Sequence, residues 1–206
     1  MSPIDVAAAL LSALLHAGWN AAVKANRQPA QAMMAQMVLG ALLVLPLLAW
    51  TGLPATGAWP WIALSALLNL VTVSALLRAY ELGGFGIVYP VVRALAVLMV
   101  VPLAALVTGH LVGAGAFSGI AIIALSLGLL AWDASRGHGV ALGALGWAAL
   151  AGLGTAGYIL CDAQGVRASG SPLAYGFVAS IANALVMCFR QRRAGPVWQQ
   201  LKGQWL

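Results

Sequence analysis

The chain has 206 residues, of which 63% are hydrophobic and only 7% are charged. Soluble domains carry about 25% charged residues, so this chain has too few polar groups to cover a water-facing surface and is an integral membrane protein. The net charge of +6 would suit a nucleic-acid ligand. Basic residues spread along a membrane chain are instead typical of cytoplasmic loops, and we expect no nucleic-acid partner.

A helix needs about 20 apolar residues to cross the hydrocarbon core of a bilayer, and the sequence offers about seven such runs. Breakers rich in glycine, proline and asparagine separate most of them. Because the connections are short, neighbouring helices should run antiparallel, and the predicted fold is an all-α bundle of membrane helices without an extramembrane domain. The predicted spans are residues 4–24, 31–50, 60–80, 87–108, 111–132, 141–162 and 172–189.

The basic residues sort to the two ends of these predicted helices. Arg93 enters its helix from the end that carries most of them, and only Arg167 falls at the opposite end. The positive-inside rule then predicts an N-terminus outside the cytoplasm. The residues at the basic end are Lys24, Arg27, Arg78, Arg136, Arg190, Arg192, Arg193 and Lys202.

Polar side chains in the first run are candidate functional residues, because such groups are unfavourable in lipid unless they face a cavity or a partner. The spacing of His16, Trp19, Asn20 and Lys24 places all four on one face of a helix. We expect His16, Trp19 and Asn20 to line a cavity or to bond neighbouring helices. Lys24 would either join them or extend to the membrane interface.

The third and fourth runs contribute further candidates. Asn69 would either join helices by hydrogen bonds or line a cavity. Tyr89 and Arg93 lie one turn apart near the start of the fourth run. Arg93 would extend to the interface, attract an anionic group, or pair with Glu81 while the site is empty.

The sequence holds no recognisable catalytic or metal-binding arrangement. It has no Ser/His/Asp set, no carboxylate cluster, no HExxH motif and no Walker loop. We therefore expect no enzymatic activity, no metal site and no cofactor. The acids all fall near the ends of predicted helices, and they are Asp5, Glu81, Asp133 and Asp162.

A long stretch after the third run resembles the end of a repeat in the drug/metabolite transporter superfamily, EamA branch. Its sequence is AYELGGFGIVYPVVRALAVLMVVPLAALVTGHLVGAGAFSGIAIIALSLGLLA. The resemblance rests on Ala79-Tyr80, the small residues of 83–86, Pro90, Gly109 and the glycines of 119–128.

The first run is similar to the first helix of the same family, through Trp19-Asn20 and Lys24. The resemblance therefore covers at least residues 4–132. One departure is that the family's Gly-Glu pair is Gly109-His110 here, so a role of that glutamate is not carried over.

The resemblance implies ten helices in two five-helix repeats of inverted topology. A shift of 139 residues, which aligns Leu11 with Leu150 and Gly18 with Gly157, supports a second repeat that starts in the sixth run. We expect a first repeat over residues 1–135 and an incomplete second one over 140–206, which makes the chain a truncated or degenerate form. The family also implies cytoplasmic termini, opposite to the orientation that the basic residues predict.

The expected function is that of a secondary carrier, which moves small organic metabolites or amphipathic drugs across a bacterial-type inner membrane by alternating access. Because histidine titrates near neutral pH, His16 could exchange a coupling proton. The candidate proton or charge partners are His16, Lys24 and Glu81. The candidate cavity residues are His16, Trp19, Asn20, Asn69, Tyr89 and Arg93.

Other functions remain open at this point. One alternative is a lipid-linked sugar flippase, and another is a non-transporting, truncated membrane partner protein; a membrane enzyme is least favoured. The expected partners are a small-molecule substrate, the lipid bilayer, and either a second copy of the chain or the missing helices of the second repeat.

Overall fold

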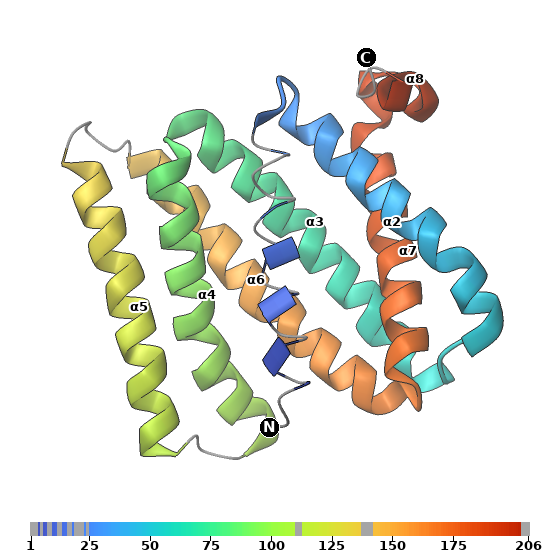
Figure 1. Ribbon diagram of the computed structural model, residues 1–206, viewed down its shortest axis with the longest axis horizontal. Helices are drawn as coiled ribbons and strands as arrows, with labels where there is room; N and C mark the ends of the chain where they lie inside the picture. Colours follow the sequence, from blue (N-terminus) through green and yellow to red (C-terminus); the bar gives the residue numbers. More distant parts are fainter. Residues whose placement is uncertain are drawn as a thin grey trace.

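The computed structural model describes residues 25–109, 113–136 and 142–202, together with residues 4, 6, 7, 10, 11, 14, 15, 18 and 23. In this part of the chain the regular elements are helices, and there is no strand (Figure 1). The long helices are α2 (Pro29–Thr51), α3 (Trp59–Leu82), α4 (Phe85–Thr108), α5 (Ala114–Ser135), α6 (Leu142–Ser169) and α7 (Pro172–Gln191). Shorter elements are the 3₁₀ turns η1 (Thr56–Ala58) and η2 (Arg192–Ala194), and the helix α8 (Val197–Lys202).

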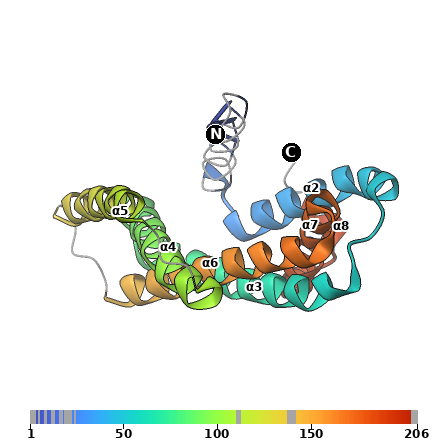
Figure 2. The ribbon, with the colours of Figure 1, turned by 90° about the horizontal axis from the view of Figure 1, so that it is seen from below.

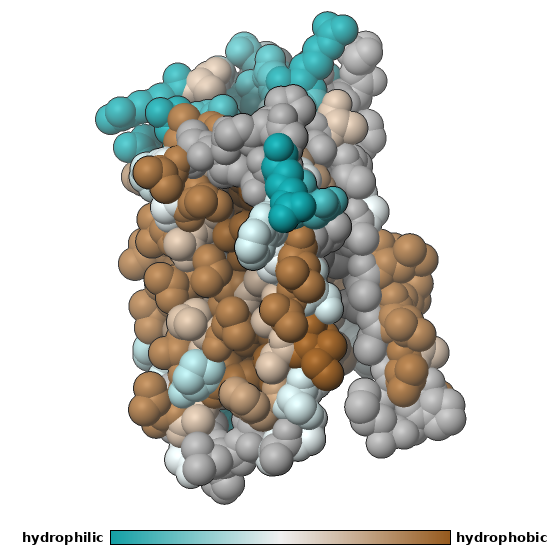
Figure 3. Space-filling model, turned by 90° about the vertical axis from the view of Figure 1, so that its left-hand side faces the viewer, coloured by the Kyte–Doolittle hydropathy of each residue, from teal (hydrophilic) through white to brown (hydrophobic). Residues whose placement is uncertain are grey.

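Within the described residues, five helical stretches are long and apolar enough to cross a membrane. Large apolar side chains are exposed along them, and Figure 3 shows such side chains covering the middle of one face. The prediction of an all-helical membrane protein is therefore confirmed. The predicted span at residues 4–24 falls mostly outside the described residues and α5 has only a shorter apolar stretch, so the total of seven stays a prediction. The five are Pro29–Thr51, Thr56–Leu82, Phe85–Leu106, Leu142–Ser169 and Pro172–Ala194.

Helix α6 is longer than the sequence suggested. We expected it to end at residue 162, but it continues to Ser169. It stops there because Gly170 adopts a left-handed conformation (φ +69°) and Pro172 starts the next helix. As a consequence Asp162 lies seven residues inside α6, and the prediction that every acid sits near a helix end is wrong for this residue.

Helix α6 occupies the centre of the bundle. It packs most extensively against α3 and next against α4, while α2 and α7 form a second closely packed pair. Helix α5 packs against α4 at one edge of the bundle, and α2 and α7 form the opposite edge (Figures 1 and 2).

The two ends of the bundle differ in charge. Among the described residues, every Lys and Arg except Arg93 and Arg167 lies at the end where α3, α5 and α7 finish and α8 follows. Figure 3 shows hydrophilic side chains gathered at one end of the molecule. This is the partition that the sequence predicted for the described residues.

Two glycines of α6 allow its close approach to α3 and α4. A Cβ atom at Gly152 would lie 2.7 Å from Leu95 Cβ and 3.1 Å from the carbonyl oxygen of Val92, both on α4. At Gly154, a Cβ would collide with Thr72 Oγ1 of α3. In lipid, where helices associate by packing instead of by the hydrophobic effect, small residues of this kind bring backbones together.

A carboxylate links α6 to two further helices. Ser65 Oγ of α3 donates a hydrogen bond to Asp162 Oδ1 at 2.6 Å, and the Tyr175 hydroxyl of α7 donates to the same oxygen at 2.8 Å. Tyr175 is buried, and its ring packs directly over the backbone of Gly165. Asp162 therefore joins three helices through neutral donors.

The close approach of α6 to α4 gives a first prediction. Gly152→Ala should lower the unfolding free energy by about 1–3 kcal/mol, because the new methyl group meets backbone and Cβ atoms that cannot rotate away. Gly146→Ala is the matched control, since it lies in the same helix with open space around it, and it should be neutral or gain up to about 1 kcal/mol of helix propensity. Thermal melts of the two purified variants in detergent would test this, and equal melting temperatures would contradict it.

The Asp162 link gives a second prediction. Asp162→Asn keeps an acceptor oxygen for both hydroxyls and should retain most of the stability. Asp162→Ala should lose about 1–3 kcal/mol, because two interhelical hydrogen bonds disappear. The readout is the fraction of protein that remains monodisperse on gel filtration after heating. An Ala variant as stable as the Asn variant would show that the link contributes nothing.

Candidate functional site

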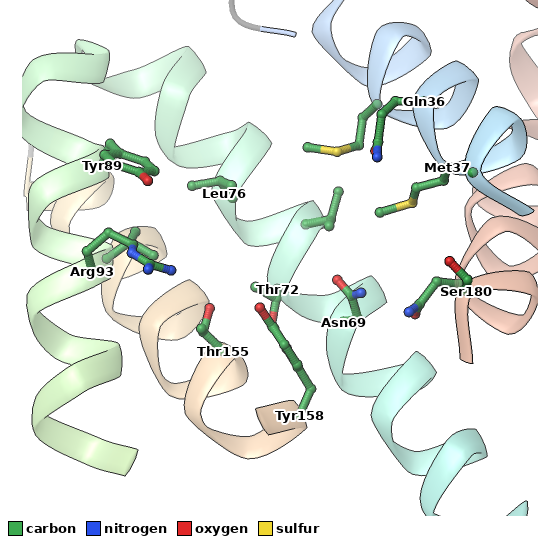
Figure 4. Close-up of a pocket in the computed structure, with 15 residues that line it drawn as sticks. Gln36, Met37, Asn69, Thr72, Leu76, Tyr89, Arg93, Thr155, Tyr158 and Ser180 are labelled. Atoms are coloured by element: carbon green, nitrogen blue, oxygen red, sulfur yellow. The ribbon is translucent and has the colours of Figure 1, made fainter. Parts of the chain in front are cut away.

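A cavity of about 290 Å³ lies among five helices of the bundle (Figure 4). Its lining comes from α2 (Met33, Gln36, Met37, Gly40), α3 (Asn69, Thr72, Val73, Leu76), α4 (Tyr89, Val92, Arg93), α6 (Thr155, Tyr158) and α7 (Ser180, Asn183).

The cavity reaches the middle of the helices. Thr72 comes thirteen residues after the start of α3 at Trp59 and ten before its end at Leu82. Thr155 is equally central in the 28 residues of α6. At a rise of about 1.5 Å per residue, Thr72 and Thr155 are roughly 15–20 Å from either end of their helices. Met33 and Tyr89 lie closer to an end, each four residues after the start of its helix. The cavity therefore extends from the middle of the bundle toward the end where α2 and α4 begin.

One side of the cavity is cationic and aromatic. Figure 4 shows the Arg93 guanidinium pointing into the cavity, with the Tyr89 ring above it and the Tyr158 hydroxyl directed into the same space. Tyr89 is held by stacking on Phe85, with ring centroids 5.1 Å apart. Arg93 of α4 and Tyr158 of α6 line the same cavity. Two phenol hydroxyls therefore accompany the guanidinium.

The other side of the cavity carries neutral polar groups. Asn69 of α3 faces Ser180 of α7, and Gln36 and Met37 of α2 approach from above in Figure 4. Asn183 also lines this side, and its Oδ1 is buried without a hydrogen-bond partner in the described part of the chain. An orphaned buried acceptor of this kind is uncommon in proteins.

Two threonines line the floor between these sides. Thr72 Oγ1 donates to the Leu68 carbonyl oxygen and Thr155 Oγ1 donates to that of Ala151, each at 2.8 Å. Because both hydroxyl protons are used within their own helices, the threonines can offer only acceptor lone pairs to a molecule in the cavity.

The structure brings together three of the sequence candidates, Asn69, Tyr89 and Arg93, which come from α3 and α4 and line one cavity. Four others, His16, Trp19, Asn20 and Lys24, lie outside the described residues. That the three bind a substrate stays a proposal.

Glu81 is not part of the cavity lining. It forms an ion pair with Arg78, one turn earlier in α3, and both side chains are more than half exposed at the basic end of the bundle. The alternative that Arg93 pairs with Glu81 is therefore wrong. Arg78 lies three residues before Glu81 on the same face of α3, which brings the two side chains together.

Sequence reasoning missed several residues of the lining. Asn69 was a candidate because it is a polar residue within an apolar run. Gln36 in the second run and Asn183 in the seventh have the same property. Tyr158 carried a further signal, because the shift of 139 residues aligns it with Trp19.

The chemistry available in the cavity is recognition by charge, hydrogen bonds and aromatic contact. Among the residues described, no group of three or more His, Cys, Asp or Glu side chains is placed to hold a metal ion. The polar groups converge from separate helices around an open space, as is common in sites that bind small molecules.

Comparison with known proteins does not place the chain in a family. No family model matches it, no curated protein matches its sequence, and no solved structure matches its fold. The resemblance to EamA-type transporters therefore stays a prediction from the sequence, and the function has to be inferred from the cavity.

Proposed function

We propose that this protein is a secondary carrier that moves a small organic solute across a bacterial-type inner membrane by alternating access. The observation that carries this proposal is the polar cavity that reaches the middle of a bundle of apolar helices. Transporters of inverted-repeat architecture bind their substrates near the midplane, between helices of the two repeats. Here α2 and α7, which hold the second position in each predicted repeat, pack against each other beside the cavity.

The size of the cavity favours a small solute. Its volume of about 290 Å³ is at the lower end of the range of about 300–1,000 Å³ that is usual for ligand pockets. A flippase for lipid-linked sugars would need a much larger opening and a basic pocket for the headgroup. Arg93 is the sole cationic side chain among the described residues of the lining, so the carrier is the better supported of the two functions.

Helix α4 is suited to move during transport. It has prolines at positions 90 and 102 inside its length, and each removes one backbone hydrogen bond and weakens the helix locally. Tyr89 and Arg93 flank the first of these prolines. A change in the bend at Pro90 would therefore reposition two cavity residues together.

We propose that the basic end of the bundle faces the cytoplasm, following the positive-inside rule. Helix α8 lies at this end (Figure 1), so the C-terminal part of the described chain would be cytoplasmic. The connection between α2 and η1, at the opposite end, would face outward.

The orientation can be tested with single cysteines in a variant that lacks Cys161 and Cys188. Arg27→Cys and Arg136→Cys, at the basic end, should react with a membrane-impermeant maleimide only after cells are permeabilised. Leu53→Cys is the control at the opposite end, where Leu53 is 69% exposed, and it should react in intact cells. The reverse labelling pattern would contradict the proposed orientation.

The carrier function can be tested in proteoliposomes of the full chain. A mixture of organic acids, amino acids, nucleosides and sugars is offered outside under an imposed pH gradient, and the vesicle contents are measured by mass spectrometry. At least one solute should accumulate above the level in empty liposomes. Its uptake should fall about tenfold or more in Asn183→Leu, which fills the cavity and removes hydrogen bonding.

Leu43→Ala, a change at an exposed side chain of α2, is the control and should leave uptake unchanged. An uncoupler should abolish accumulation if a proton drives it. Folded protein that moves none of these solutes would overturn the carrier proposal.

A further inference from the structure

We infer that the cavity binds a small organic monoanion, a carboxylate that pairs with Arg93 and carries a neutral hydrogen-bond donor at its other end. This inference rests on the proposed carrier function, and it adds the chemical class of the substrate. Three features of the lining carry it: an uncompensated cation, the two phenols beside it, and an orphaned amide oxygen on the opposite side.

The first feature is the charge of Arg93. A guanidinium stays protonated in proteins, and a charge inside the membrane is unfavourable unless it is paired or hydrated. None of the described acidic side chains pairs with Arg93. Glu81 pairs with Arg78, Asp162 accepts bonds from two hydroxyls, and Asp133 is exposed near the end of α5. The described protein therefore leaves the charge of Arg93 for a ligand to neutralise.

The second feature identifies the anion as a carboxylate. Arginine presents two parallel N–H donors that match the two oxygens of a carboxylate. The Tyr89 and Tyr158 hydroxyls lie on the same side of the cavity (Figure 4) and can donate to the remaining lone pairs. A phosphate monoester carries a charge of about −1.5 to −2 at neutral pH. With a single cation among the described lining residues, the cavity is better matched to one negative charge.

The third feature describes the other end of the ligand. Asn183 Oδ1 is a buried acceptor without a partner among the described residues. Asn69 and Ser180 line the same side of the cavity, and the described lining has no charged side chain there. A hydroxyl or amide group of the ligand would satisfy Asn183. A second carboxylate would find no cation there, so a dicarboxylate should bind poorly. Met33 and Met37 offer an apolar surface that can adapt to the middle of the molecule.

The experiment measures binding to the purified full chain by the change in its tryptophan fluorescence. The probes are ω-hydroxy monocarboxylates of three to eight carbons, the matched primary amides, the matched dicarboxylates and the matched phosphate monoesters. At the best chain length, the acid should bind about tenfold or more tightly than its amide, as expected for a charge-assisted hydrogen bond. The dicarboxylate and the phosphate monoester should also bind more weakly than the acid.

Substitutions of Arg93 then test whether this side chain causes the preference for the acid over its amide. In Arg93→Gln the acid and the amide should bind with equal affinity. Arg93→Lys should keep a reduced preference for the acid, because lysine keeps the positive charge but lacks the two parallel N–H donors of arginine. Leu43→Ala should behave as the unchanged protein. The comparison of acid with amide in the unchanged protein needs no variant, so it tests the inference even if Arg93→Gln does not fold.

The two proposals fail in different ways. If proteoliposomes carry neutral or cationic solutes and the acid has no advantage over its amide, the anion inference is overturned and the carrier function stands. If the acid binds through Arg93 but no solute crosses the membrane, the carrier function is overturned and the anion site stands. A phosphate monoester that binds best would overturn the assignment to a carboxylate.

Discussion

The close backbone contact of α6 with α3 and α4 is the constraint on which the rest of the bundle depends. Gly152 faces α4 and Gly154 faces α3, so α6 lies in the groove between its two neighbours. The residues that follow, Thr155 and Tyr158, then face the cavity at mid-height. A bulkier residue at either glycine would separate the helices and move the side chains that define the site.

Polar and charged side chains away from the contact of α6 with α3 and α4 are hydrogen-bonded to neighbouring helices. Seven residues inside α6, Asp162 accepts hydrogen bonds from hydroxyls of α3 and α7. Near the end of α7, Arg190 Nε donates to Ser74 Oγ at 2.9 Å. These contacts tie separate helices together through neutral partners. Arg93 differs because it points into a space instead of toward a described partner. Arg93 lies eight residues after the start of α4, within the apolar part of the helix, where an unpaired charge is unfavourable.

Composition and run length were enough to predict a helical membrane protein. The shortage of charged residues indicates a chain that lies in lipid, and a long apolar run in lipid satisfies its backbone hydrogen bonds within a helix. Polar residues in apolar runs pointed to Asn69, Tyr89 and Arg93, which line one cavity in the structure; their role in binding stays a prediction. The end of α6 could not be predicted in this way. Asp162 looked like a boundary because hydropathy falls there, whereas Ser65 and Tyr175, distant in sequence, make its burial acceptable. Which polar residues of α2 and α7 join the cavity also depends on contacts between helices that no single run reveals.

The helix that holds the proposed counter-ion also has a backbone interrupted by proline, as α2 has at Pro46. Pro90 has no N–H group, so the carbonyl oxygen of Gly86, four residues earlier, lacks its usual partner within α4. Arg93 follows less than one turn later. In a carrier, a bound anion must be released after the site opens to the other side, which requires that its contacts weaken when the helices rearrange. If α4 bends at Pro90, the guanidinium moves relative to Tyr158, which is fixed on the tightly packed α6, and the two groups cease to hold one ligand together. In the proposed carrier, the position of Arg93 on the proline-containing α4 and of Tyr158 on the closely packed α6 would therefore couple ligand release to helix movement.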